Sequence, residues 1–261
     1  MVKVLEVNNL NYGYFKNINL AFNKETFYSI VGGNNSGKTT LFKLMTGMIS
    51  CHNKIICNGV NTDSISKYIQ NIGVVERVKG NDFIYQKVKD EMIYPLYNLG
   101  YSKKRIEKRI REVTDLFSFN SLDQNINELK ENERQLLLIM LALLHHPKVL
   151  FFDNVFSVFS PSEETEILSV LKEFIEKEKI AIINFSSTLN EMFASDKIIL
   201  LSNFEIIGQY LLNDVYRDDK LFYQNGLEIP FIVDLSIKLK MYDLIDKNYT
   251  NMKAMVDDIW P

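Results

Sequence analysis

One nine-residue stretch, from Gly32 to Thr40, limits what this chain can fold into more than any other feature. It reads Gly-Gly-Asn-Asn-Ser-Gly-Lys-Thr-Thr and fits the pattern G-x-x-x-x-G-K-[ST]. Residues 27–31 before it form an apolar run suited to a buried strand, and residues 41–45 after it have helical character. A strand, this pattern and a helix in succession predict a phosphate-binding loop rather than a turn that only caps a helix.

The chemistry of phosphate binding explains the residue types in this loop. Glycines let the backbone approach a phosphate closely, while backbone N–H groups and the start of the helix donate to its oxygens. We expect Lys38 to reach the outer phosphates and the Thr39 hydroxyl to hold Mg²⁺. Asn35 stands where glycine is common, and asparagine tolerates a left-handed backbone better than most residues. The predicted nucleotide-binding residues in the loop are Gly32, Asn34, Asn35, Ser36, Gly37, Lys38, Thr39 and Thr40.

Length and charge narrow the class of protein. A chain of 261 residues has room for one large α/β domain and an appendage. Its formal net charge of −3 gives no reason to expect nucleic acid as a partner. The N-terminal residues 2–7 alternate like a strand rather than forming a signal peptide, and apolar runs such as 136–144 are too short to span a membrane.

The cysteines and histidines give no sign of a metal site. Cys51 and Cys57 match no common metal-binding spacing, so we expect two reduced thiols. His145 and His146 are adjacent at the end of a predicted helix and point in different directions, so we expect surface residues rather than ligands.

A strand that ends in a carboxylate follows later in the chain. Residues 149–153 read Val-Leu-Phe-Phe-Asp, and in P-loop proteins such a strand lies beside the phosphate-loop strand with its terminal Asp facing Mg²⁺. Asp153 is therefore the second predicted metal ligand, with Thr39. A predicted helix over 162–178 and a buried strand over 180–185 follow, which indicates βαβ units and a largely parallel sheet.

Between these strands the pattern is mainly helical. Ile106, Ile110 and Val113 share one face of a predicted helix, and its charged residues, Arg109 among them, are expected in solvent. The predicted fold is α/β: a P-loop cassette with a mostly parallel core sheet, an N-terminal antiparallel part, a helical subdomain and a small C-terminal extension. We expect a nucleotide-binding domain over 1–215, with its helical subdomain over about 77–145, and the extension over 216–261.

The phosphate loop and the Asp153 strand together make the chain resemble an ATP-binding cassette over essentially its whole length. It is most similar to the energy-coupling-factor type, which drives uptake of vitamins and transition metals. The closer match lies in residues 88–117, residues 127–135 and the tail segment 225–235. The resemblance implies ATP and Mg²⁺ as cofactors and implies that Tyr14 stacks on adenine, although a plain hairpin tyrosine is an open alternative.

Two positions that act on the γ-phosphate in the family carry other residues here. Where the family has a glutamine that senses Mg²⁺ and the γ-phosphate, this chain has Arg77. Where the family has the glutamate that polarises the attacking water, it has Asn154. An amide cannot accept a proton, and a general base typically contributes ~10²–10⁴-fold in rate. The resemblance therefore implies that no catalytic residue is intact.

Three further motifs also depart. The signature Leu-Ser-Gly-Gly-Gln corresponds to residues 129–133, Leu-Lys-Glu-Asn-Glu. The aspartate of the next loop corresponds to Ser160, and the switch histidine to Ser186 or Ser187. The carboxylates of Glu131 and Glu133 in this stretch would repel the γ-phosphate, and the charge of Lys130 could partly compensate for them. Both glutamates also suit the N-terminus of the helix on which they lie.

The resemblance implies a subunit of a membrane importer that lies on the inner face of the cell membrane. We expect a degenerate cassette that binds Mg·ATP, hydrolyses it poorly and pairs with a second, competent cassette and a transmembrane coupling subunit. The family docks that subunit on residues 88–97, where the apolar side chains could equally belong to the core. The alternative is a non-transport ATP-binding regulatory or structural module.

Overall fold

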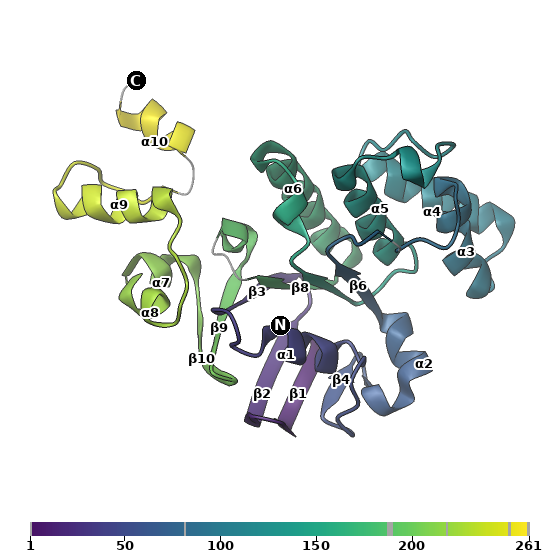
Figure 1. Ribbon diagram of the computed structural model, residues 1–261, viewed down its shortest axis with the longest axis horizontal. Helices are drawn as coiled ribbons and strands as arrows, with labels where there is room; N and C mark the ends of the chain where they lie inside the picture. Colours follow the sequence, from purple (N-terminus) through teal and green to yellow (C-terminus); the bar gives the residue numbers. More distant parts are fainter. Residues whose placement is uncertain (1, 81, 187–189, 218, 250–251, 260–261) are drawn as a thin grey trace. The chain divides into compact units, whose positions relative to one another are not determined.

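The computed structural model describes residues 2–80, 82–186, 190–217, 219–249 and 252–259 (Figure 1). Two compact units make up the chain. The larger unit comprises residues 1–27 and 39–185, and the smaller unit comprises residues 28–38 and 186–261. No helix among the described residues is both long and apolar enough to cross a membrane.

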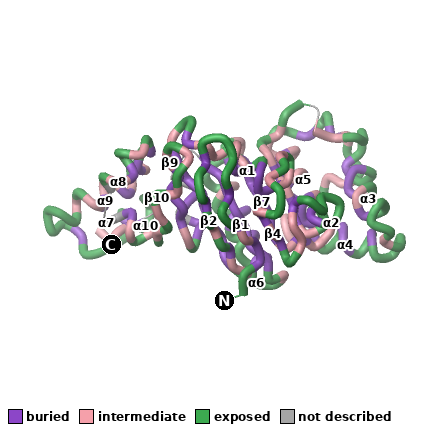
Figure 2. The backbone as a smooth tube through the Cα atoms, turned by 90° about the horizontal axis from the view of Figure 1, so that it is seen from below, coloured by how far each residue is buried: buried purple, intermediate pink, exposed green. Residues whose placement is uncertain are grey.

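The larger unit begins with an antiparallel sheet in the order β2-β1-β4-β5. The strands are β1 (Lys3–Tyr12), β2 (Phe15–Asn23), β4 (Ile55–Cys57) and β5 (Val60–Asn61). Burial changes along β1 and β2, as Figure 2 shows, because successive side chains point to opposite faces of a sheet. This part confirms the predicted antiparallel N-terminal region.

Three parallel strands follow in the larger unit: β6 (Ile72–Glu76), β7 (Val149–Asp153) and β8 (Ala181–Ser186). Strand β7 pairs with β6 on one side and β8 on the other. Their sequences are almost continuously apolar, as is typical of strands covered on both faces. Helix α1 (Lys38–Met45) packs on this group through Phe42, whose ring meets that of Phe185 edge-on at 5.4 Å. Helix α6 (Pro161–Glu178) connects β7 to β8.

Helices α3 (Val88–Asn98), α4 (Lys103–Leu116) and α5 (Glu131–Leu143) form the helical region that the sequence predicts. They lie side by side in Figure 1, and α4 contacts both of the others. Apolar side chains at 106, 110 and 113 are buried on α4, as its periodicity predicts. The shorter elements of the larger unit are α2 (Ile65–Tyr68), η1 (Thr62–Ser64), η2 (Ile69–Asn71), η3 (Ile126–Glu128) and η4 (Phe156–Val158).

The smaller unit contains the end of β3 (Thr26–Val31), which pairs in parallel with β9 (Lys197–Ser202), and β10 (Glu205–Tyr210), which pairs with β9 antiparallel. The C-terminal extension is helical and packs on these strands through one apolar cluster that includes Val31, Leu200, Phe222 and Leu227. The helices of the smaller unit are α7 (Leu212–Arg217), α8 (Asp219–Gln224), α9 (Phe231–Met241) and α10 (Met252–Ile259), and η5 (Asn190–Ala194) precedes β9.

Arg109 is buried, so the expectation that it lies in solvent is wrong. Its guanidinium donates to the carbonyl oxygens of Leu143 and Leu144, at 2.8 and 3.1 Å, and pairs with Glu178 at 3.3 Å. The last carbonyls of a helix have no partner within it, so Arg109 satisfies the end of α5 from outside. Burial opposes ionisation of Glu178, but the hydrogen bond from His146 and the charge of Arg109 outweigh it and lower its pKa.

The two histidines are half-buried rather than fully on the surface. His146 Nδ1 lies 3.1 Å from a Glu178 oxygen, and His145 Nε2 lies 2.9 Å from the carbonyl oxygen of Ile72. Burial lowers the pKa of His145. Both contacts join the end of α5 to its neighbours.

We predict that Arg109→Met lowers the free energy of unfolding by about 2–4 kcal/mol, because it leaves two helix-end carbonyls and Glu178 without their cation. The matched control is Lys108→Met, since Lys108 is exposed and its pair with Glu112 lies at the surface. Urea unfolding measures both. Equal losses of stability in the two variants would contradict this role for Arg109.

Candidate functional site

The predicted phosphate loop lies where the sequence places it, between β3 and α1. All six residues of β3 are buried, and α1 begins at Lys38 with Leu41, Phe42, Leu44 and Met45 buried. Asn35 has φ +63° and Gly37 has φ +105°, so Asn35 adopts the left-handed backbone that the sequence analysis allows for it. The loop therefore has the strand–loop–helix geometry of a phosphate-binding site.

Gly32 is required by a close approach. A methyl group at this position would lie 2.2 Å from the carbonyl oxygen of Leu201 and 2.6 Å from Ser36 Oγ. Further along the loop, the Ser36 carbonyl accepts a hydrogen bond of 2.9 Å from the N–H of Phe204. Asn203 and Phe204 form the turn between β9 and β10, both with positive φ. The β9–β10 hairpin thus holds the loop from one side, a contact that the sequence analysis does not anticipate.

Lys38 is folded onto the loop. Its ammonium donates to the carbonyl oxygens of Gly32 and Gly33, at 2.6 and 2.9 Å, and lies 3.5 Å from Ser36 Oγ. A cation is thereby held at the N-terminus of α1, where the helix dipole also favours an anion. These groups fit the phosphates of a nucleotide.

The residues available for Mg²⁺ also fit. Thr39 follows Lys38 in α1, and Asp153 is the last residue of β7. Hydroxyl and carboxylate oxygens are the ligands that Mg²⁺ prefers. When bound, the metal would neutralise charge on the phosphates, and Thr39 and Asp153 are the residues that would hold it.

A second carboxylate and a lysine lie at the same strand ends. Glu76 of β6 is the register partner of Asp153, so both side chains leave the same face of the sheet. Lys79 Nζ lies 2.7 Å from the Glu76 carboxylate. The hydrogen bond to Glu76 is the main cause of a raised Lys79 pKa, to which the charge of Asp153 also contributes. The carboxylates at this edge therefore have an internal cation beside them.

Asn154, which the resemblance assigns to the general-base position, is exposed and has a left-handed backbone with φ +54°. Its N–H donates to the carbonyl of Phe185 at 3.1 Å, and its own carbonyl accepts a 3.2 Å hydrogen bond from the Ser157 hydroxyl. Asparagine tolerates this conformation, whereas most L-residues pay roughly 1–2 kcal/mol for it. The backbone at this position therefore suits asparagine.

The structure brings two of the departing motifs together. Arg77, at the sensor position, pairs with Glu131, in the signature stretch, at 3.5 Å. Both side chains are about half exposed. Exposed ion pairs contribute little to stability. The consequence of this pair is that the two charged side chains are directed toward each other. The Arg77 backbone is fixed as well, since its N–H donates to the carbonyl of Asp153 at 3.2 Å.

Gln135, which the sequence analysis does not single out, holds the segment around Arg77. It is fully buried, accepts from the N–H of Val78 at 2.7 Å and donates to the carbonyl of Glu76 at 3.1 Å. A buried amide that satisfies two backbone groups fixes their positions. Helix α5 is therefore tied to residues 76–78.

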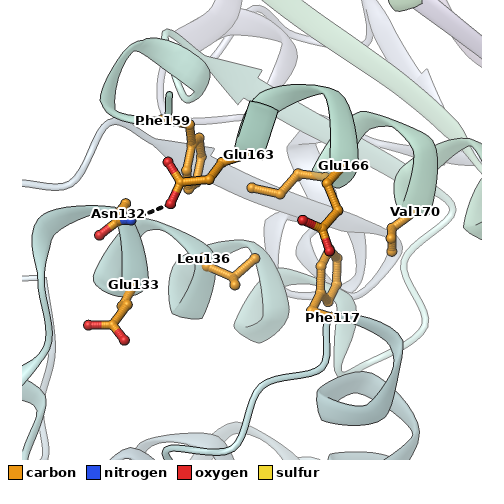
Figure 3. Close-up of a pocket in the computed structure, with 9 residues that line it drawn as sticks. Phe117, Asn132, Glu133, Leu136, Phe159, Glu163, Glu166 and Val170 are labelled. Carbon is orange, nitrogen blue, oxygen red and sulfur yellow. Dashed lines mark hydrogen bonds between the residues drawn. The ribbon is translucent and has the colours of Figure 1, made fainter. Parts of the chain in front are cut away.

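The other signature side chains are engaged at helix starts. Glu133 accepts from the N–H of Lys130 at 2.8 Å, which confirms that it suits the N-terminus of α5. Asn132 donates to Glu163 at 2.7 Å (Figure 3). Glu163 also accepts from the N–H and hydroxyl of Ser160 at the start of α6. The hydrogen bond from the Ser160 hydroxyl is the main cause of the lowered Glu163 pKa, followed by those from Ser160 N–H and Asn132.

A cavity of about 180 Å³ lies between α5 and α6 at these residues (Figure 3). Its polar side chains are Asn132, Glu133, Glu163 and Glu166. The remaining wall is apolar and consists of Phe117, Leu136, Phe159, Ile167 and Val170. The signature surface is thus rich in carboxylates, and a carboxylate disfavours a neighbouring phosphate.

The remaining predicted positions are Tyr14, Ser186 and Ser187. Tyr14 is 78% exposed in the β1–β2 turn, directly after Gly13 with φ +57°, so its ring is accessible for stacking. Ser186 ends β8 and is buried. Ser187 lies outside the described residues.

The apolar residues of the predicted docking region divide into two sets. Met92 and Leu96 are fully buried, whereas Tyr94 and Tyr97 are 38% and 70% exposed. A groove of about 690 Å³ runs between α3 and α4 beside Tyr97. Its lining is mostly apolar with a charged rim: Ile93, Tyr97, Tyr101, Ile106, Ile110 and Leu122, with Lys89, Lys103, Glu107 and Arg111.

Three known proteins are similar to this chain in sequence or in fold. The chain is 26% identical to the energy-coupling factor transporter ATP-binding protein EcfA1 of Oenococcus oeni, over 99% of this chain and 98% of that protein. It is also 26% identical to EcfA1 of Mesomycoplasma hyopneumoniae, over 100% and 97%. The solved structure of cbiO1 from Clostridium perfringens, part of the ABC transporter complex cbiONQ, matches with a TM-score of 0.77 at 22% identity, covering 90% of this chain and 99% of that one.

These likenesses agree with the geometry. The cbiO1 match confirms the predicted fold: an antiparallel N-terminal sheet, a mixed and mostly parallel core sheet and a helical subdomain. The family model described as "ABC transporter" matches residues 15–157, which include the phosphate loop, the signature stretch and Asp153. Because that match covers more than half of the 261 residues, the chain belongs to the ABC transporter family.

Proposed function

We propose that this chain is an ATP-binding subunit of an energy-coupling-factor type importer for a vitamin or a metal ion. In this proposal it binds Mg·ATP but hydrolyses it slowly or not at all. It pairs with a different, competent cassette and a transmembrane coupling subunit at the inner face of the cell membrane. Residues 1–215 form the nucleotide-binding domain and residues 216–261 the extension.

One contrast supports the poor hydrolysis. The phosphate loop has its lysine, glycines and threonine, whereas the general-base position holds the amide of Asn154. An amide cannot accept the proton of the attacking water, so Asn154 would not act as a base. The signature stretch adds carboxylates where a γ-phosphate would dock, and those of Glu131 and Glu133 already have internal partners.

The proposed mechanism follows from differential binding. ATP held by the phosphate loop of one cassette bridges to the other cassette and favours the closed pair, and nucleotide release reopens it. In this chain Lys38 binds phosphate, Tyr14 orients adenine, and Thr39 and Asp153 hold the metal. A homodimer would combine two such loops with two acidic signatures, which disfavours self-pairing.

We predict that the purified chain binds Mg·ATP and that Lys38→Ala abolishes binding, because the ammonium on the loop is lost. Turnover by the wild-type chain should stay at background. Isothermal titration measures binding, and phosphate release measures turnover. Clear turnover that disappears in Lys38→Ala would contradict the proposal and would mean that another residue supplies the base.

We further predict that Asn154→Glu restores little turnover, because the signature remains acidic and the left-handed backbone disfavours glutamate. Phosphate release in the presence of saturating ATP checks this, with circular dichroism as the control for folding. Recovery of turnover by a factor of about 10² or more, the lower end of what a general base supplies, would contradict the account of the signature.

The groove between α3 and α4 supplies a test of the membrane partner. We predict that Tyr97→Glu prevents copurification with a hydrophobic transmembrane subunit while the chain stays folded, because Tyr97 is exposed and a charge opposes apolar docking. Ile69→Glu, at another exposed apolar position of the larger unit, is the matched control. Unchanged copurification of Tyr97→Glu would argue against this docking surface. Absence of any membrane partner for the wild-type chain would favour a non-transport ATP-binding module.

A further inference from the structure

A turn of the C-terminal extension lies directly against the phosphate loop. A methyl group placed on Gly33 would lie 3.0 Å from the carbonyl oxygen of Asn225, 3.3 Å from that of Gly226 and 3.4 Å from Gly226 Cα. Conversely, a methyl group placed on Gly226 would lie 3.6 Å from Gly33 Cα. The close approach therefore depends on the missing side chain at Gly33, whereas a methyl group on Gly226 would make an ordinary contact.

The turn is itself well held. It ends α8, where the N–H groups of Gly226 and Leu227 donate to the carbonyls of Tyr223 and Phe222 at 3.0 and 3.1 Å. The Asn225 amide donates to Leu221 at 2.8 Å, and Gly226 has φ +75°. These are the contacts of a helix that ends in a left-handed residue.

The apolar cluster anchors the turn to the strand that leads into the loop. Leu227 is buried in one cluster with Val31, the last residue of β3, and with Phe222 of α8. Val31 immediately precedes Gly32. The turn and the loop are therefore fixed to the same group of side chains.

Gly33 has a partner on the loop side as well. Its carbonyl accepts a 2.9 Å hydrogen bond from Lys38, the residue expected to bind phosphate. The loop has two other supports, the close contact of Gly32 with Leu201 and the hydrogen bond between Ser36 and Phe204. The turn is thus a further support, and it acts at one of the two residues whose carbonyls accept from Lys38.

We propose that the Asn225–Gly226 turn is a positioning element of the nucleotide site. The docked turn holds Gly33, and through it the loop, in the conformation that accepts phosphate. A cradle that is ordered in advance binds more tightly because less ordering is required on binding. By linkage, nucleotide in the loop then stabilises the docked turn to the same extent. This inference rests on the proposed binding of ATP by the loop.

The first test uses Gly33→Ala, because the nearest atoms to the added methyl group all belong to the turn. We expect Mg·ATP to bind at least about 5-fold more weakly, the lower end of typical coupling between sites. Gly80→Ala is the matched control, since a methyl group there meets nothing within 4 Å. Gly226→Ala should also weaken binding, because its φ of +75° strains any residue with a side chain and so loosens the turn. Its control is Gly59→Ala, which has a similar φ of +79° and open space around it.

The second readout is hydrogen exchange of the amides in residues 222–227. If the turn had a purely structural role, nucleotide would not change the rate of this exchange. Mg·ATP should slow this exchange in the wild-type chain and leave it unchanged in Lys38→Ala. Gly33→Ala should speed it even without nucleotide, because the methyl group displaces the turn. Circular dichroism checks that each variant is folded.

The outcomes separate this inference from the proposed function. Suppose that the wild-type chain binds Mg·ATP. If exchange at 222–227 then does not respond to nucleotide, or if Gly33→Ala and Gly226→Ala bind as tightly as their controls, the inference is overturned. The proposed binding of ATP still stands in either case. If the wild-type chain does not bind Mg·ATP, both are overturned. Weaker binding in both variants together with slower exchange on ATP addition would support the inference.

Discussion

The close packing of backbone around the phosphate loop is the constraint on which the rest of the site depends. The Leu201 carbonyl leaves no room for a side chain at Gly32, and the Phe204 N–H holds the Ser36 carbonyl. With the loop fixed in this way, the Lys38 ammonium settles on two loop carbonyls at the start of α1. The loop thus holds a cation at the start of a helix, and in our account it binds phosphate without further rearrangement of the backbone.

The departing motifs are connected to one another rather than scattered. Arg77 pairs with Glu131, and Gln135 fixes the backbone on both sides of Arg77. Asn132 and Ser160 meet through Glu163. A charged side chain at one motif position, such as Arg77, therefore has a partner at another, such as Glu131. Such pairing compensates the charges of exposed and half-buried side chains. In our account this network replaces the surface that a competent cassette offers to a γ-phosphate.

The sequence predicts those features of the fold and the site that neighbouring residues determine. It does not predict contacts between residues that lie far apart in the chain. The strand–loop–helix unit, the left-handed Asn35 and the buried Asp153 strand follow from local patterns, and the structure has them in those places. The contacts of Gln135 join positions 57 and 59 residues apart, and no local pattern reports such a pairing. Arg109 illustrates the same limit. An arginine within a charged run is expected in solvent, and only the folded structure shows that the end of α5 lies against it. The contact of Gly33 with the Asn225–Gly226 turn is of this kind too.

The central claim is that this chain binds ATP and yet does not form a competent site with itself. The most direct measurement is native mass spectrometry of the purified chain with saturating Mg·ATP. Our account predicts a monomer that carries one ATP, because two acidic signatures cannot close on two γ-phosphates. A nucleotide-dependent homodimer that holds two ATP molecules and releases phosphate would contradict it.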